Sequence, residues 1–145
     1  MRILISLIYI LAINSYSADY SSESSGKETY NFSIDTLEGY FSKIRKTEGT
    51  LTDSLGNYSV NTCVRTLVKD KGKVNLNLIC ENTDQNQQKN WSKLYSNKTI
   101  DDSVIRIVEY FEATDTFKFL VGKECNYALK FYEKNYFFFK QKCKL

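Results

Sequence analysis

Four cysteines are the most informative reactive residues in this chain of 145 residues, which contains no histidine. Without an imidazole the protein cannot form a Ser-His-Asp triad, a Cys-His pair or a histidine-ligated zinc or haem site. Carboxylates that could act as an acid–base pair lie close together at Asp101 and Asp102 and at Glu109 and Glu112, but they form no recognisable catalytic constellation. We therefore expect neither an enzyme nor a bound cofactor or metal.

The cysteines indicate disulfides instead. They are even in number and widely spaced, and none belongs to a Cys-x-x-Cys pair, a pattern that favours an oxidising compartment over a metal site. The four are Cys63, Cys80, Cys125 and Cys143. Their spacing leaves all three possible pairings open.

The first 18 residues have the features of an export signal. Arg2 precedes a continuous apolar run over residues 3–13, and small residues up to Ala18 offer a cleavage site. The apolar run is shorter than the roughly 20 residues that a helix needs to cross a bilayer. We therefore expect residues 1–18 to be a signal peptide, the protein to be secreted and extracellular, and no segment to span a membrane.

The overall composition favours one exported globular domain. A net charge of +3 is too balanced for a nucleic-acid partner, and the length suits a single core. In a secreted chain, Asn-x-Ser/Thr sequons are candidate N-glycosylation sites. Here they are Asn31, Asn57, Asn90 and Asn97.

The elements that must position these residues are mostly short strands. Residues 19–30 are polar and serine-rich and predict a mobile leader, and the apolar spacing from Ile34 to Ile44 predicts a short helical turn. The glycine in residues 70–73 predicts a tight hairpin turn, and the polar stretch 81–90 predicts a loop. Alternating apolar residues predict strands over 60–69, 74–78, 91–95, 104–112, 117–121, 127–131 and 136–142.

Short links between consecutive strands favour antiparallel neighbours. An antiparallel meander of seven or eight strands must protect its edges, and the two general solutions are a sandwich and a closed barrel. In an eight-stranded barrel, the inward side chains can line a cavity for one small ligand. In a sandwich, the same aromatic residues would fill a dry core.

Two stretches resemble sequence motifs of the lipocalin family. Asn31–Lys46 (NFSIDTLEGYFSKIRK) resembles the opening motif, with Asn31 and Phe32 followed by Gly39 at the entry to the first strand. Phe41 stands where the family has tryptophan, and phenylalanine can close the end of a barrel without the indole N–H.

The second stretch, residues 122–131 (GKECNYALKF), resembles a later lipocalin motif through Asn126, Tyr127 and Ala128. The family's arginine at the end of the last strand has no clear counterpart, and no segment corresponds to the long helix after the barrel. The resemblance implies an all-β fold over residues 31–145. This fold would be an antiparallel up-and-down barrel, lipocalin-like, with a short N-terminal helical turn.

The resemblance also implies a carrier or scavenger of a small hydrophobic or amphipathic ligand, because an apolar cavity removes ligand surface from water. Tyr110 or Tyr127 could hydrogen-bond such a ligand, and Arg106 could pair with an acidic one if it faces inward. Alternation along the predicted strands gives the candidate wall residues. They are Val64, Val68, Leu76, Leu78, Ile105, Ile107, Phe117, Phe119, Tyr127 and Leu129.

In lipocalins, a cysteine near the second strand is usually bridged to the end of the chain. The resemblance therefore implies a bridge from Cys63 to Cys143, which leaves Cys80 for Cys125. The alternative to a carrier is a secreted β-rich module with a dry core that binds another protein, for example a host protein in immune modulation. A bound small molecule would favour the carrier, and a captured protein would favour the module.

Overall fold

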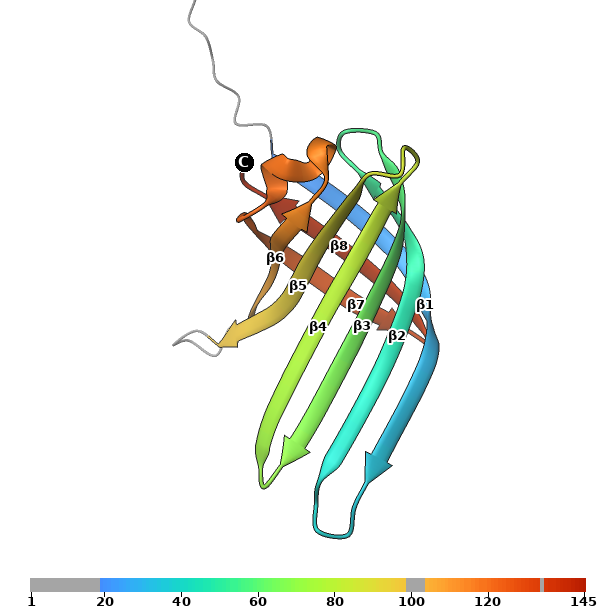
Figure 1. The fold of residues 1–145 in the computed structure, drawn as a ribbon, viewed down its shortest axis with the longest axis vertical. Helices are drawn as coiled ribbons and strands as arrows, with labels where there is room; N and C mark the ends of the chain where they lie inside the picture. The colour runs from blue at the N-terminus through green and yellow to red at the C-terminus, as the bar shows by residue number, and fades with distance from the viewer. Residues whose placement is uncertain (1–18, 99–103, 134) are drawn as a thin grey trace, which may run out of the picture.

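The computed structural model describes residues 19–98, 104–133 and 135–145, so the expected signal peptide over residues 1–18 lies outside the described part. Eight strands and one short 3₁₀ helix follow each other along the chain (Figure 1). The strands are β1 (Tyr20–Asp35), β2 (Phe41–Asp53), β3 (Tyr58–Asp70), β4 (Lys73–Asp84), β5 (Lys89–Lys98), β6 (Val104–Ala113), β7 (Glu124–Tyr132) and β8 (Tyr136–Cys143), and the helix η1 (Asp115–Leu120) separates β6 from β7.

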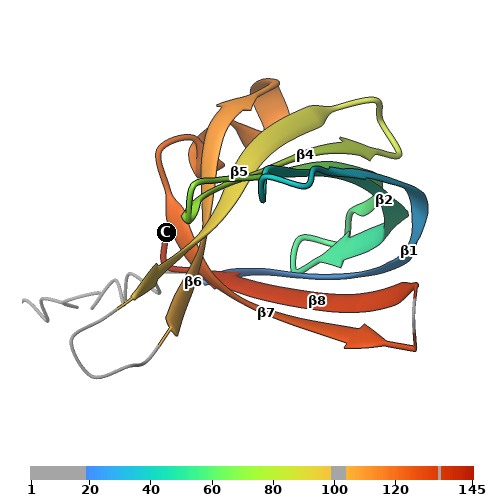
Figure 2. The ribbon, with the colours of Figure 1, turned by 90° about the horizontal axis from the view of Figure 1, so that it is seen from below.

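The eight strands form one closed barrel. Each strand pairs antiparallel with the next, and β8 returns to pair with β1, which lies beside it in the view from below (Figure 2). This confirms the prediction of an all-β, antiparallel up-and-down barrel. The tight turn at Lys71 and Gly72 is also confirmed, since both residues have a positive φ, as a two-residue hairpin loop between right-twisted strands requires.

The prediction of a mobile leader over residues 19–30 is wrong, because β1 begins at Tyr20 and closes the barrel. Its residues pair with β2 on one side and with β8 on the other, so the backbone groups are bonded on both edges. The small side chains of Ser22 and Ser24 are buried on the inner face. The serine-rich composition therefore allows close packing here and does not indicate disorder.

A pair of glycines lets β1 and β2 approach closely. Gly26 lies opposite Gly49, and a methyl group on either residue would collide with the backbone carbonyl oxygen of the facing strand, that of Glu48 or of Ser25. Just beyond this point β1 leaves β8, since their pairing ends at Lys27. The glycine pair therefore lies where β1 changes from a barrel strand to an edge strand.

The predicted helical turn between Ile34 and Ile44 is also wrong. Residues 36–39 form the turn of the β1–β2 hairpin, in which the Tyr40 amide donates to Thr36 Oγ1 over 3.1 Å and Gly39 has a φ of 83°. Within the described residues the single helix is instead η1, where the sequence predicts a strand over 117–121. Phe117 and Leu120 are three residues apart, which is the 3₁₀ period, and both are fully buried at one end of the barrel.

The predicted loop over residues 81–90 is mostly strand. Only residues 85–88 turn, because Asp84 Oδ1 accepts hydrogen bonds of 2.8 Å from the amides of Asn86 and Gln88. Asp53 organises the β2–β3 turn in the same way, accepting from the amides of Leu55 and Asn57 over 2.9 Å. Each aspartate thus replaces missing backbone partners in a tight turn.

The first four strands continue beyond the barrel as a four-stranded extension. Residues 28–35 of β1 pair only with β2, and residues 73–78 of β4 pair only with β3. The extension projects below the shorter strands β5 to β8 in Figure 1. The barrel therefore has one end closed by η1 and one end where the walls separate.

Candidate ligand-binding cavity

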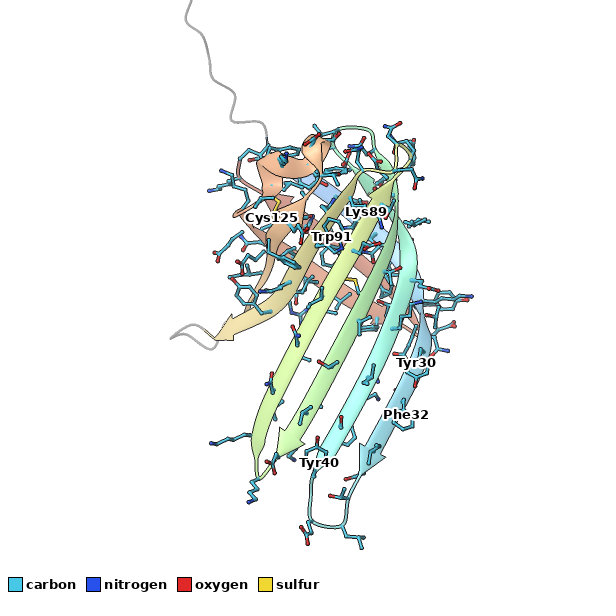
Figure 3. All side chains as sticks on the ribbon, viewed as in Figure 1. Tyr30, Phe32, Tyr40, Lys89, Trp91 and Cys125 are labelled. Atoms are coloured by element: carbon cyan, nitrogen blue, oxygen red, sulfur yellow. A yellow bond between two sulfur atoms is a disulfide. The ribbon has the colours of Figure 1, made fainter. Side chains whose placement is uncertain are left out.

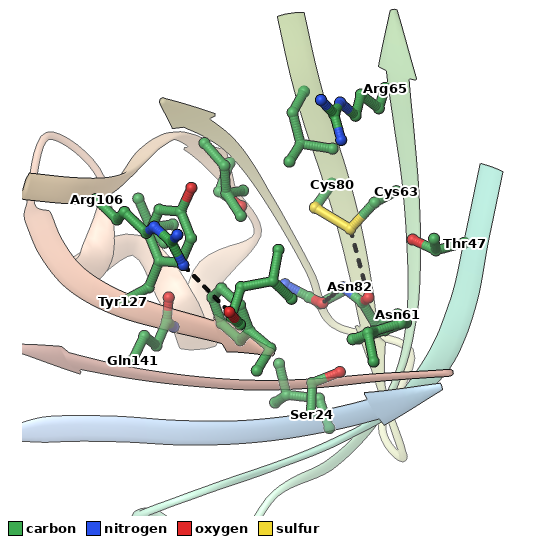
Figure 4. A pocket seen from close by; sticks show the side chains of 18 of the residues that line it. Ser24, Thr47, Asn61, Cys63, Arg65, Cys80, Asn82, Arg106, Tyr127 and Gln141 are labelled. Atoms are coloured by element: carbon green, nitrogen blue, oxygen red, sulfur yellow. Dashed lines mark hydrogen bonds between the residues drawn. A yellow bond between two sulfur atoms is a disulfide. The ribbon is translucent and has the colours of Figure 1, made fainter. Parts of the chain in front are cut away.

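The barrel encloses a cavity of about 360 Å³ (Figure 4). Every strand contributes to its wall, mostly through alternate residues as the period of two along a strand requires, although the adjacent Leu94 and Tyr95 of β5 both line it. The disulfide between Cys63 and Cys80 lies on this inner face, between β3 and β4. The apolar side chains of the wall are Leu51, Leu76, Leu78, Leu94, Val108, Leu129, Phe131, Phe137 and Phe139.

Uncharged polar groups line the part of the cavity towards the closed end. Asn61 Nδ2 donates to Asn82 Oδ1 over 2.5 Å, and Asn82 Nδ2 donates to Asn90 Oδ1 over 2.7 Å. On the other side of the barrel, Gln141 Nε2 donates to the Tyr110 hydroxyl. The three asparagines bond to one another across the neighbouring strands β3, β4 and β5, and Gln141 reaches from β8 to β6, which fixes these side chains in place.

Two buried tyrosines lie at the closed end. Burial raises the pKa of Tyr110 to about 12, although the hydrogen bond from Gln141 acts in the opposite direction. Burial likewise raises the pKa of Tyr20, whose hydroxyl donates to Asp53 Oδ2 over 3.3 Å. Both phenols are therefore neutral at physiological pH.

A serine hydroxyl in the wall lacks a partner. Ser24 is 6% exposed and lines the cavity from β1, and its Oγ has no hydrogen-bond partner among the described residues. Buried hydroxyls are nearly always hydrogen-bonded in folded proteins, because an unpaired one loses its hydration without compensation. Ser24 thus offers a donor and an acceptor to a molecule in the cavity.

Three arginines contribute positive charge to the wall, and Glu28 is the one acidic residue there. Arg45 Nε lies 3.3 Å from Glu28 Oε2, which makes an ion pair. Arg106 Nη1 donates to the backbone oxygen of Leu129 over 3.1 Å. Arg65 makes no hydrogen bond or ion pair with any described residue. The wall therefore carries a net charge of +2.

The hydroxyl of Tyr127 is influenced electrostatically by two of these arginines. Burial raises the pKa of the Tyr127 hydroxyl, while the guanidiniums of Arg106 and Arg65 both act to lower it. The two cations belong to β6 and β3 and thus to different parts of the wall, and Figure 4 shows Arg106 beside Tyr127 and Arg65 near the bridge between Cys63 and Cys80. The ring of Tyr127 is stacked on Phe139 at 5.3 Å between centroids, which fixes the position of the phenol.

The structure places four of the ten predicted wall residues in the cavity, namely Leu76, Leu78, Tyr127 and Leu129. Val64 and Val68 do not line it, because they alternate with the inward residues Cys63 and Arg65 on β3. The prediction that these valines line the wall is therefore wrong, because the inner face of β3 is the one that carries Cys63 and Arg65.

The remaining predicted wall residues also lie elsewhere. Phe117 and Phe119 both belong to η1. Phe117 is buried, and the ring of Phe119 contacts that of Tyr20 edge-on, with 5.7 Å between the ring centroids. Ile107 is not part of the wall, because it alternates with the inward residues Arg106 and Val108 on β6. The side chain of Ile105 lies outside the described part of the structure. Arg106 and Tyr110, proposed as polar contacts, do line the cavity.

Sequence reasoning missed Arg45, Arg65 and the asparagines of the inner face. In the structure Cys63 and Cys80 lie directly opposite each other and both point inward, which the spacing of the cysteines in the sequence does not show. Counting by two from Cys63 reaches Asn61 and Arg65, which are both in the wall. Alternation alone groups the valines of this strand on one face, and it does not show that this face is the outer one.

The disulfides pair Cys63 with Cys80 and Cys125 with Cys143. The pairing implied by the lipocalin resemblance, from Cys63 to Cys143 and from Cys80 to Cys125, is therefore wrong. Each observed bridge joins residues directly opposite each other on neighbouring strands, whereas β3 and β8 are not neighbours. Two disulfides fit an extracellular or secreted protein.

The sequons lie in different environments. Asn31 is exposed on β1, whereas Asn57 is half-buried and donates to Asp53. Asn90 is 3% exposed and bonded to Asn82 inside the barrel, so the folded structure has no room for a glycan there, and this predicted site is wrong. The side chain of Asn97, on β5, lies outside the described part.

Compared with protein-family models, curated proteins and solved structures, the chain matches none of them. The eight-stranded antiparallel barrel is consistent with a lipocalin-like fold. None of the helices in the described ranges is both long and apolar enough to cross a membrane.

Proposed function

We propose that this protein is a secreted, lipocalin-like carrier that holds a small hydrophobic or amphipathic molecule in the barrel. The observation that carries this proposal is the cavity of about 360 Å³, whose wall combines leucine and phenylalanine side chains with a few fixed polar groups. Such a combination is typical of small-molecule sites, where apolar surface supplies affinity and convergent polar groups supply orientation.

The unpartnered Ser24 hydroxyl supports the same proposal. An enclosed polar group with no partner costs free energy, and a ligand hydroxyl or carbonyl would remove that cost. The hydrogen-bonded amides around it are already satisfied and keep the wall rigid. A rigid cavity binds without losing much side-chain entropy.

Native mass spectrometry of protein purified from a eukaryotic secretory host tests the carrier function. We expect a bound species of a few hundred daltons that disappears after organic extraction. A matched pair of variants locates it: Leu78→Trp fills the cavity, whereas Ile79→Trp adds the same ring on the opposite face of β4. Loss of the bound mass in Leu78→Trp alone supports the proposal, and retention in both variants contradicts it.

A second candidate function is binding of another protein, because several apolar side chains are exposed on the outer face of β1 to β4, at and next to the four-stranded extension. The register pairs Phe32 with Ile44 and Val64 with Ile79, and it places Lys46 between Tyr30 and Val64. The apolar members of this outer patch are Tyr30, Phe32, Ile34, Ile44, Val64 and Ile79. Each is more than a third exposed, and Tyr30 and Phe32 are labelled on this part of β1 in Figure 3. Contiguous exposed apolar patches of this kind are typical of interaction surfaces.

Phe32→Ser separates the second candidate from the first. A protein partner that binds through the patch would be captured by the wild type and by Leu78→Trp, and lost with Phe32→Ser. The bound small molecule should not respond to Phe32→Ser, since this residue does not line the cavity.

A further inference from the structure

The positive charge in the cavity wall is uncompensated. Arg45 and Arg65 lie directly opposite each other on β2 and β3, and like charges at opposed positions of a sheet repel each other. Glu28 compensates Arg45, and no acidic side chain of the wall is left for Arg65 or Arg106. An apolar barrel that places two unneutralised guanidiniums around its opening lowers the free energy of an anion there.

Most donors of these two residues have no partner among the described residues. A guanidinium has five N–H donors, and within the described part of the chain Arg106 donates one hydrogen bond, to Leu129, and Arg65 donates none. The hydroxyl of Tyr127, whose pKa both guanidiniums act to lower, adds a further donor. Arginine suits a planar carboxylate because two parallel N–H groups can bind its two oxygens.

The apolar side chains around the arginines determine the chemistry that the rest of the ligand must have. Leu78, Leu129 and Phe139 line the wall next to the arginines, and Leu94 and Val108 continue it towards the closed end. Arg106 is exposed and Arg65 half-buried, whereas Leu94 and Val108 are buried. The charged groups therefore lie at the open side and the apolar surface lies deeper.

We infer that the cavity selects amphipathic carboxylates, with the carboxylate held by Arg65, Arg106 and the Tyr127 hydroxyl and the apolar chain directed towards Leu94 and Val108. This inference rests on the proposed carrier function, since it names the ligand class of the same cavity. It gives Arg65 and Arg106 a counter-charge that no described acidic side chain of the wall supplies.

Three ligands with the same chain and different heads test the inference: dodecanoate, dodecanol and dodecyltrimethylammonium. Their affinities are measured at neutral pH by displacement of a fluorescent fatty-acid analogue from the delipidated protein. We expect dodecanoate to bind about ten- to a hundredfold more tightly than dodecanol, because hydrogen bonds to charged groups are worth about twice those between neutral ones. The cationic ligand should bind most weakly.

The double variant Arg65→Gln/Arg106→Gln keeps the approximate size of both side chains and removes their charge. We expect its affinities for dodecanoate and dodecanol to become equal within about threefold, because the affinity for the carboxylate falls far more than that for the alcohol. Lys46→Gln is the matched control, since Lys46 follows Arg45 on β2 and lies on the outer face, where it pairs with Glu48 at 2.6 Å. It should keep the preference of the wild type.

The experiment distinguishes a failure of the anion preference from a failure of the carrier function. If dodecanol binds the wild type as tightly as dodecanoate, the anion preference is overturned and the carrier function stands. If none of the three ligands nor the fluorescent analogue binds, the carrier function falls together with it. The wild-type comparison decides the inference even if the double variant does not fold.

Discussion

Two buried tyrosine hydroxyls at the closed end of the barrel make the stability of the protein depend on alkaline pH. Tyr110 is 2% exposed and bonded to Gln141, and Tyr20 is equally buried with its hydroxyl on Asp53. Neither phenol can ionise without placing a charge in a region of low polarity. Both groups are thus more stable in the protonated form within the folded state.

The first prediction is that stability falls between pH 10 and pH 12. The pKa of Tyr110 is about 12 in the folded protein and 10 as its ordinary value, so the unfolded chain loses the proton first. The contribution is complete below pH 10 and is lost as the pH rises through 12, on the order of 2 kcal/mol in total. Urea unfolding followed by circular dichroism at several pH values measures it.

Tyr110→Phe is the comparison for this prediction. It should be less stable than the wild type at pH 8, since Gln141 loses its partner, and its stability should depend less on pH above 10. Equal slopes for both proteins would show that Tyr110 does not titrate as described.

The second prediction concerns Gly49. A methyl group there would overlap the carbonyl oxygen of Ser25, so Gly49→Ala should lower the free energy of unfolding by about 2 kcal/mol or more. Ser25→Ala is the control, because Ser25 is exposed and its replacement should change stability by less than about 0.5 kcal/mol. Chemical unfolding followed by the fluorescence of Trp91, the one tryptophan, measures both. Similar small effects of the two changes would contradict the close approach of β1 and β2.

At the scale of strands and turns, sequence patterns predicted what depends on neighbours in the chain. The strands from Val60 to Lys69 and from Val104 to Glu112 alternate in polarity, and both are present as part of β3 and β6. The positive φ at Gly72 was predicted because glycine adopts it without strain. Local chemistry was sufficient for these elements.

Other elements depend on partners far away in the chain. β1 is a strand because β2 and β8 bond both of its edges, and its serine-rich sequence has no apolar period to indicate this. The same limit affected the cavity. Alternation shows that Val64 and Arg65 face opposite sides of β3, but it does not show which side is inside. The cross-strand position of Cys63 opposite Cys80 decides this, and it is known only once the register is known.

The third prediction concerns the β3–β4 hairpin. Lys71 has a φ of 45°, a left-handed conformation that lysine adopts at a cost and that asparagine tolerates better. Lys71→Asn should therefore raise the free energy of unfolding by about 0.5 kcal/mol, measured by urea unfolding. Lys73→Asn, at the start of β4 and outside the two-residue turn, is the control and should not stabilise the protein. A loss of stability in Lys71→Asn would contradict the turn geometry.

The fourth prediction concerns the disulfide between Cys63 and Cys80, which closes a loop of 17 residues along the chain. Replacing both cysteines by alanine should lower the free energy of unfolding by about 3 kcal/mol in the chain-entropy model. The paired variant leaves no free thiol from this bridge, and the bridge from Cys125 to Cys143 is unchanged. Thermal unfolding at matched pH measures the loss. An unchanged midpoint would mean that the hairpin alone fixes the register.

At the scale of the whole molecule, the barrel combines a tightly closed end with a more open one. Phe117 and Leu120 of η1 cover the closed end, and the long hairpins β1–β2 and β3–β4 continue past the other. The cavity lies between these ends, and its charged groups lie nearer the open side. For the proposed amphipathic carboxylate, this arrangement predicts entry from the open side with the apolar chain first.

The positions of the two disulfides have a consequence for the ring of strands. Each bridge links strands that a hairpin already connects, β3 with β4 and β7 with β8. Among the eight junctions of the ring, the one between β8 and β1 has neither a connecting loop nor a sulfur bridge. It is held by non-covalent contacts, namely the backbone pairing from Tyr20 to Lys27 and the ion pairs of Lys140 with Glu23 and of Lys142 with Asp19. The barrel can therefore part at this junction and re-form with every covalent cross-link intact. Two copies could exchange their first strands there without any thiol chemistry.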